Sequence, residues 1–409
     1  MNKTHRNTLF ACYTGFVTQA IVNNLAPLLF VIFQDQFHIS LEKISWLIML
    51  NFGTQLVIDA LCVKFADRIG YRSLIVAAHI FCVVGLLFLS ALPHVLGYAG
   101  LLIAVMTYAI GGGITDVLLN PIADALPKGD NAASMSLVHS FYCWGHVAVV
   151  LLTTLAMRVI GADAWPVLPV LWAAVPLINA YRFAKVPIVK PAEEKLVSVK
   201  ALLFNRFFLL ALILMIASGA SELAMSQWVS LFAEKGLRVS KVLGDLLGPC
   251  LFAVFMGTGR VLFGKYGQKI NIQKALSYSA VLCILCYAVA SISLNPLVAL
   301  AGCALTGLSV SLMWPGMVSF SARRFTGGGT AMFSLLAMGG HIGCSIGPWM
   351  TGVVSAAAEN WRWVVSIGER QGLDAMQTGL KSGLLLAAIF PLALLIGMFL
   401  FRRAEVEKN

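Results

Sequence analysis

Six ionisable side chains lie deep inside long apolar stretches of the sequence. The acidic ones are Asp59, Asp116 and Glu222, and the histidines are His139, His146 and His341. An ionisable side chain costs about 2.5 to 3.5 kcal/mol at the centre of a membrane-spanning helix, so such residues usually face a partner or an aqueous cavity. They are the first candidates for proton exchange or ligand binding.

Asp116 begins a polar stripe that continues through Asn120 and Asp124. Residues four apart share one face of a helix, and the preceding run Gly111–Gly113 allows neighbouring helices to pack closely. A carboxyl group shielded from water disfavours its charged form. We therefore expect Asp116 to exchange the proton. The alternative is that a neighbouring His or Arg satisfies Asp116, which then only stabilises the bundle.

Glu222 lies on a second polar face, with Ser218 four residues before it and Ser226 four after it. Gln227 and Trp228 follow within the next turn. Amides, a carboxylate and an aromatic ring together suit a sugar, which needs hydrogen bonds for its hydroxyls and an apolar surface for its C–H groups. Glu222 is thus a second proton-coupling candidate, and Gln227 and Trp228 are substrate-binding candidates. Alternatively, Trp228 is an interfacial belt residue.

His139, Tyr142 and His146 share a further face, because they are three and four residues apart. We expect His139 and Tyr142 to bind substrate. A Gly precedes both His146 and His341, so these two histidines are either packing residues at tight helix crossings or, for His341, a ligand.

Asn23 and Asn24 are adjacent and must face different directions. One is expected to bind substrate while the other packs, and their spacing does not distinguish them.

Asp67, Arg68 and Arg72 gather where one apolar run ends and the next begins. A charge network at such a loop can latch helix ends in one conformation and release them in another. We expect these three residues, together with Arg260 at the related end of a later apolar run, to act in gating. Asp59 lies one to two turns from this loop and is a candidate for the same network.

Composition excludes a soluble fold. Of the 409 residues 59% are hydrophobic and 11% are charged, less than half of the roughly 25% charged residues of soluble domains, and the mean hydropathy is +0.86. The basic residues, which give a net charge of +11, lie between apolar runs, which argues against nucleic-acid binding. We expect an all-α polytopic membrane protein with twelve helices near 8–33, 44–64, 73–92, 98–122, 133–158, 164–186, 206–233, 243–264, 274–293, 296–321, 328–357 and 378–401.

The two halves of the chain echo each other. Pro121 pairs with Pro315, and Gly113 pairs with Gly307, at the same offset. This repeat predicts two pseudo-symmetric six-helix bundles, 1–186 and 204–409, joined by a linker at 187–203. Most Lys and Arg residues fall on the side that holds both termini, which places the termini in the cytoplasm.

Neither an enzyme nor a cofactor protein is expected. The sequence has no evident nucleophile–base pair, metal cluster or soluble catalytic domain, and most of its nine cysteines lie inside apolar runs, where a thiol behaves as a small hydrophobe. Cys283 and Cys286 form an isolated CxxC with no second pair or His at metal-ligand spacing. We predict no cofactor and no metal.

The loop Asp67-Arg68-Ile69-Gly70-Tyr71-Arg72 resembles the signature of the major facilitator superfamily, although Val63 or Lys64 replaces the glycine that opens it. Within that superfamily the chain looks most like the fucose, galactose and glucose:proton symporters. The resemblance rests on Asn23-Asn24-Leu25, Asp116 to Pro121, His139 to Gly145 and Gly219 to Glu222.

This resemblance implies alternating access and assigns Asp116 to the position of a protonation and sugar-binding carboxylate. Two departures imply a different ligand, a different coupling scheme, or both. Pro27 aligns with a family Asp, and His139 and Tyr142 align with the Gln and Asn that bind sugar.

Three modes of transport follow as hypotheses: proton-coupled symport of a sugar or sugar-like solute, proton-driven efflux of drugs or metabolites, and sodium-coupled sugar symport. The expected partners are a small solute, protons and the lipid bilayer. The expected setting is the bacterial inner membrane, with the protein working as a monomer.

Overall fold

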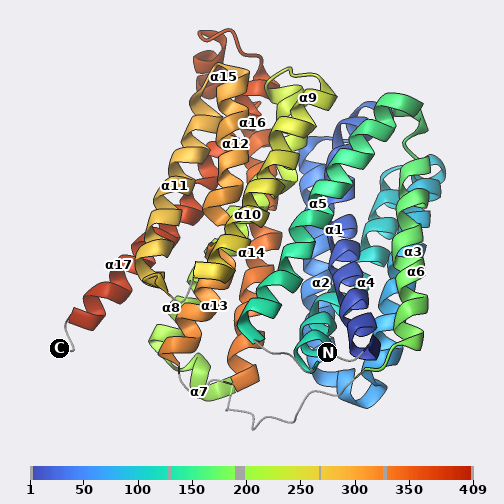
Figure 1. Cartoon of the computed structure of the whole chain (residues 1–409). Helices are drawn as coiled ribbons and strands as arrows, with labels where there is room; N and C mark the ends of the chain where they lie inside the picture. The colour runs from blue at the N-terminus through green and yellow to red at the C-terminus, as the bar shows by residue number, and fades with distance from the viewer. Residues whose placement is uncertain (1–2, 127–130, 189–198, 267–268, 326–328, 407–409) are drawn as a thin grey trace. The chain divides into compact units, whose positions relative to one another are not determined.

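The computed structural model describes residues 3–126, 131–188, 199–266, 269–325 and 329–406. Within these ranges some side chains, including those of Asp67 and Asp124, are outside the described residues. The chain divides into two compact units. Unit 1 comprises Met1–Ala192 and Lys241–Leu246, and unit 2 comprises Glu193–Ser240 and Leu247–Asn409. Figure 1 shows the course of the chain from blue to red.

Unit 1 contains six long helices, and each of them is long and apolar enough to cross a membrane. The innermost is α1, because 89% of its apolar window is buried, against 39% to 61% for the other five. These six match the predicted spans within a few residues at each end. They are α1 (Lys3–Phe37), α2 (Leu41–Ile69), α3 (Tyr71–Leu96), α4 (Tyr98–Asp124), α5 (Asn131–Ile160) and α6 (Val167–Lys185), with the short η1 (Ala162–Ala164) before α6.

The predicted loop after the second helix is much shorter than the sequence indicated. Helix α2 continues to Ile69, and α3 begins at Tyr71, so Gly70 alone joins them. Gly70 has φ of 96°, a conformation that costs glycine little and other residues much more. The signature residues therefore lie at helix ends rather than in a loop.

Unit 2 contains the other six predicted spans, several of them broken into shorter pieces. Five qualify as membrane spans by length and composition. The sixth, α14, is 30 residues long, and its glycines and His341 lower its apolar character. The elements of this half of the chain are α7 (Val199–Leu203), α8 (Arg206–Leu231), η2 (Phe232–Gly236), α9 (Lys241–Asp245), η3 (Leu246–Cys250), α10 (Leu251–Tyr266), α11 (Ile272–Ile292), α12 (Pro296–Val310), α13 (Met313–Arg324), α14 (Gly329–Ala358), α15 (Arg362–Glu369), α16 (Ala375–Ala387) and α17 (Ile389–Val406). Of these, α9 and the first residue of η3 belong to unit 1.

The tenth predicted span is two helices, α12 and α13, separated by Ser311 and Leu312. Pro315 explains the break, because proline has no N–H to donate to the carbonyl of Ser311 and its ring clashes with that carbonyl. The matching proline of the first half, Pro121, lies inside the continuous helix α4.

Small residues let α8 and α14 pack backbone to backbone in unit 2. A Cβ atom added to Gly219 or Gly343 would collide with a carbonyl oxygen of the facing helix, and one added to Gly347 would collide with Ala220. This packing fixes the side chains of Glu222 and His341, one on each helix, relative to each other.

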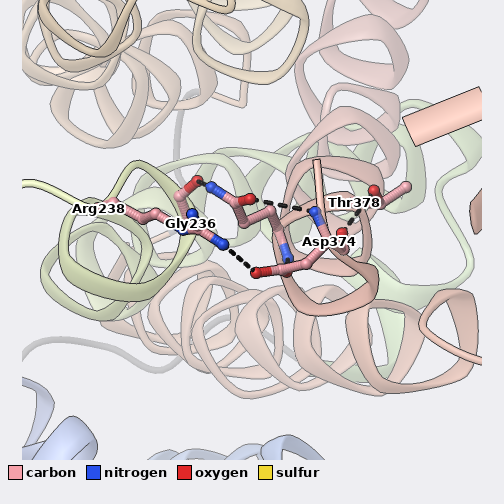
Figure 2. A network of polar contacts seen from close by, with 5 residues as sticks. Gly236, Arg238, Asp374 and Thr378 are labelled. Carbon is pink, nitrogen blue, oxygen red and sulfur yellow. Dashed lines mark hydrogen bonds and ion pairs between the residues drawn. The ribbon is translucent and has the colours of Figure 1, made fainter. Parts of the chain in front are cut away.

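A polar network ties the start of α16 to the end of η2, as Figure 2 shows. Asp374 accepts from the backbone N–H of Gln377 at 2.7 Å and from Nη2 of Arg238 at 2.8 Å. The Gln377 side chain donates to the carbonyl of Gly236 at 3.1 Å. Asp374 and Gln377 form a reciprocal capping box, which anchors the last predicted span to the seventh.

Candidate functional site

Four buried amide side chains from α1 and α2 form one hydrogen-bonded network. Gln55 donates to Asn23 Oδ1 at 2.8 Å and to Asn51 Oδ1 at 3.2 Å. Asn51 also donates to Asn23 Oδ1 at 3.3 Å, and Gln19 donates to Gln55 Oε1 at 3.0 Å. All four side chains are at most 6% exposed. Asn23 is thus directed towards α2.

Two carboxyl groups, one on α2 and one on α4, lie close to each other. Asp59 follows Gln55 by four residues, and a carboxylate oxygen of Asp59 lies within 4.8 Å of one of Asp116. Asp59 is buried, with 4% of its surface exposed. We call Gln19, Asn23, Asn51, Gln55, Asp59, Asp116 and Asn120 the polar file of unit 1.

The three glycines before Asp116 make this approach of helices possible. A Cβ on Gly113 would lie 2.9 Å from the carbonyl oxygen of Gln55, and one on Gly112 would lie 3.2 Å from the Gln55 side chain. Gly111 faces Ala78 and Cys82 of α3 instead. The glycine run therefore packs α4 against two neighbours at once and brings Asp116 to α2.

Asn24 is directed away from α2, towards α5. Its Nδ2 donates to Tyr142 Oη at 3.3 Å and to the carbonyl of Ala20 at 2.9 Å. Its Oδ1, like Gln19 Oε1 and Asn120 Oδ1, is a buried acceptor that has no hydrogen-bond donor among the described residues. A buried acceptor without a donor costs about 1 to 3 kcal/mol, so these oxygens are suited to a ligand that brings donors.

The histidines of α5 have different surroundings. The ring of His139 is half-buried and lies 5.1 Å from the ring of Phe16. His146 is more deeply buried and is 2% exposed. The last residue of the predicted stripe, Asp124, has a side chain outside the described residues.

In unit 2 the two charged candidates pair with each other. Arg260 Nη2 donates to both carboxylate oxygens of Glu222, at 3.2 and 3.1 Å. Their side chains are 13% and 9% exposed. This largely buried ion pair joins α8 to α10, so any change in the charge of Glu222 also weakens the link between these helices.

The remaining candidates of unit 2 are buried. Trp228 is 1% exposed and donates its Nε1–H to the carbonyl of Pro348 at 2.8 Å. An interfacial position for Trp228 is therefore wrong. Gln227 is 2% exposed, and His341 is 9% exposed, with its ring 5.7 Å from that of Trp314.

The expected gating residues of unit 1 are only partly described. The side chain of Asp67 is outside the described residues, and Arg68 is exposed. Arg72 donates to the carbonyls of Phe183 at 3.2 Å and Ala184 at 2.7 Å. Arg72 thus caps the carboxyl end of α6, where a positive charge interacts favourably with the helix dipole.

Several buried polar residues were not singled out in the sequence. Asn51, Gln55 and Asp59 follow one another at intervals of four residues and so share one face of a helix. This spacing was the available signal, but uncharged amides are less conspicuous in an apolar run than charged residues. Asp245, which is 0% exposed, accepts from Thr154 at 2.8 Å and lies 3.1 Å from Lys241. The charge of Asp245 inside a predicted span was the available signal.

Lys381 was also not singled out, although it is a charged residue inside the predicted span 378–401. It is 7% exposed, and its Nζ donates to the carbonyls of Ser293 at 2.6 Å and Ser291 at 3.3 Å. These are at the carboxyl end of α11, so Lys381 satisfies a helix end inside unit 2.

Comparison with known proteins decides the family. The family model of the Major Facilitator Superfamily matches residues 11–348. The chain belongs to the major facilitator superfamily. It is accordingly a multi-pass membrane transporter and not an enzyme, with the twelve-helix fold of two six-helix bundles.

Solved structures of similar fold include three transporters. A bacterial homologue of the human lysosomal transporter Spinster, inward-facing and occupied, is 15% identical, with 98% of each chain covered and a TM-score of 0.76. For a variant of the E. coli fucose:proton symporter the identity is 15%, the coverage 97% of this chain and 99% of that chain, and the TM-score 0.63. A D-xylose-proton symporter is 15% identical, with 94% of this chain and 95% of that chain covered and a TM-score of 0.71.

At these identities the likeness establishes the fold alone. A comparison with curated protein sequences gave no match.

Proposed function

We propose that this superfamily member carries a sugar or a sugar-like small polar solute together with a proton, by alternating access, and that Asp116 takes up the proton. The observation that carries the proposal is the pair of carboxyl groups in the polar file. Two ionised carboxylates no more than 4.8 Å apart repel by at least about 3 kcal/mol at an effective dielectric constant of about 20. A proton on one of them removes this repulsion.

In this proposal amide groups lead from the pair towards α1. Gln55, which lies one turn before Asp59, donates to Asn23 and accepts from Gln19. None of the seven residues of the polar file is basic. Protonation of Asp59 or Asp116 therefore changes the charge of the file, as a coupling site requires.

The donors and acceptors of unit 1 indicate the class of solute. Asn24 Oδ1 and Asn120 Oδ1 accept hydrogen bonds but have no donor among the described residues. Tyr142 Oη and His139 add groups that both donate and accept. A ligand rich in hydroxyl groups supplies the missing donors, and two of the structurally similar transporters are named for fucose and xylose.

The second unit contributes a polar face of its own in this proposal. Glu222 and Arg260 are paired, so a proton taken up by Glu222 would weaken this ion pair and with it the link between α8 and α10. Gln227, Trp228 and His341 are the proposed solute contacts of this unit, with Trp228 held in place by its hydrogen bond to Pro348.

The remaining parts of the proposal concern topology. We place both termini in the cytoplasm of a bacterium, with the chain in the inner membrane as a monomer. The bundles 1–186 and 204–409 are the moving halves, with 187–203 as the linker.

Asp67, Arg68 and Arg72 are proposed to latch the cytoplasmic ends of helices, and the hydrogen bonds of Arg72 to α6 are consistent with that role.

The test is uptake of labelled hexoses, deoxyhexoses and sugar acids into proteoliposomes with an imposed inward proton gradient. We compare the wild type with Asp116→Asn and, as a matched control, with Asp163→Asn, which changes an exposed acid of η1. Gradient-driven uptake that is lost only in Asp116→Asn is expected.

Three other outcomes have distinct meanings. Uptake driven by a sodium gradient instead would show that the carboxyl pair binds a cation. No sugar uptake, with proton-driven export of another solute, would establish efflux. Unchanged uptake by Asp116→Asn would remove Asp116 from the mechanism.

A further inference from the structure

A cavity of about 260 Å³ lies at one end of unit 2, between the start of α11 and the end of α13. Its volume is below the roughly 300 to 1,000 Å³ of most small-molecule sites, so it suits a compact group. It contains no residue of the candidate transport site. It is lined by Asn271, Ile272, Gln273, Phe320, Arg323 and Arg324.

The lining of this cavity is basic. Arg323 and Arg324 supply two guanidinium groups, and none of the six lining residues is acidic. Arginine is the side chain best matched to phosphate, because its planar N–H groups bind two oxygens at once. The electrostatic character of the cavity therefore favours an anion with several oxygens.

The guanidinium of Arg324 is held in place by aromatic rings. It lies 5.2 Å from the ring of Phe207 and 5.5 Å from the ring of Phe401. Phe401 is fully buried and also contacts Phe320 at 5.1 Å between ring centroids. Stacking of this kind fixes a long side chain before any ligand binds, which lowers the entropy lost on binding.

The opposite wall is the first turn of α11, a helix of 21 residues. Asn271 uses its side-chain oxygen to accept from the N–H of Lys274 at 3.0 Å, so its amide N–H₂ group remains as a donor. The backbone N–H groups of Ile272 and Gln273 precede the first hydrogen-bonded turn and point along the helix axis, out of the helix. The cavity thus presents donors from two helices.

We propose that this cavity binds the phosphate group of an anionic ligand, held by Arg323 and Arg324 of α13 against the start of α11. Two sources share this chemistry: the headgroup of an anionic phospholipid, and free phosphate or a small phosphorylated solute. The binding is separate from the transport site, so the proposal stands or falls independently of the proposed function.

The experiment uses the purified full chain in detergent and two probes. Native mass spectrometry measures retention of phosphatidylglycerol, and equilibrium dialysis measures binding of labelled inorganic phosphate. The variants are Arg323→Gln and the double variant Arg323→Gln/Arg324→Gln. The control is Lys265→Gln/Lys269→Gln, which removes the same charge from exposed positions outside the cavity.

We expect at least tenfold weaker binding of one probe in the double variant and unchanged binding in the control, since each lost charge-assisted hydrogen bond is worth about that factor. Loss confined to phosphatidylglycerol identifies a lipid headgroup, and loss confined to phosphate identifies a soluble ligand. If the double variant fails to fold, Arg323→Gln alone keeps the test, because Arg323 is exposed. Absence of binding by either probe, or an equal loss in the lysine control, overturns the proposal.

Discussion

Substituting Gly113 by Ala would move α2 and α4 apart and thereby disturb the carboxyl pair. The added Cβ would lie 2.9 Å from the carbonyl oxygen of Gln55 and 2.9 Å from Cβ of Ile58, whereas ordinary contact begins at 3.4 Å. The helices must separate by the difference, about 0.5 Å, because a backbone carbonyl cannot rotate away. Overpacking of this kind costs about 1 to 3 kcal/mol.

The matched control is Gly112→Ala on the same helix. Its Cβ would meet only the side chain of Gln55, at 3.2 Å, and that side chain can adjust by a few tenths of an ångström. We therefore expect a clearly lower Tm in detergent for Gly113→Ala than for Gly112→Ala. Equal effects of the two substitutions, or a wild-type Tm for Gly113→Ala, would refute the argument from backbone contact.

Three further predictions concern charged side chains. Arg260→Ala should cost about 3 to 5 kcal/mol of unfolding free energy, because it leaves the buried carboxylate of Glu222 uncompensated; the double change with Glu222→Gln should recover part of this loss in a denaturant titration. Arg72→Ala should lower stability by about 0.3 to 1 kcal/mol in the same titration, since it removes the cap of α6; an unchanged midpoint would argue against that capping role. Burial raises the pKa of Asp374, but a backbone N–H of α16 and the Arg238 guanidinium outweigh it, so its pKa is held below the ordinary value of 3.8. The stabilisation that ionised Asp374 provides is therefore complete above about pH 4 and is lost as the pH falls through its lower pKa in the folded protein. The Tm of Asp374→Asn should accordingly depend less on pH in the acid range than the Tm of the wild type. An identical pH profile of Tm for the two proteins would contradict this.

The fold was largely predictable because a membrane requires about 20 apolar residues for each crossing. That single physical requirement separates the twelve spans, including α14, whose glycines lower its mean hydropathy. It does not set the ends of helices. Whether α2 stops at Lys64 or continues to Ile69 depends on a one-residue connection at Gly70, which hydropathy alone does not reveal.

The candidate site was predictable only in part. Charge in an apolar run identified Asp116, Glu222 and Asp59, because burial of an unpaired charge is expensive. Partners are a tertiary property, so the spacing could not show that Asn23 bonds to α2 while Asn24 bonds to α5. For the same reason the sequence could not show that Arg260 pairs with Glu222, which lies 38 residues earlier.

The break between α12 and α13 has a mechanical consequence. A helix resists bending through its continuous ladder of hydrogen bonds, and a proline that interrupts the ladder makes that point the most compliant one of the span. The two halves share the proline, but only the second has the break. We therefore expect the tenth span to bend most readily at Ser311 and Leu312, between its two helices, and the fourth span, whose helix continues through Pro121, to bend less sharply at that proline.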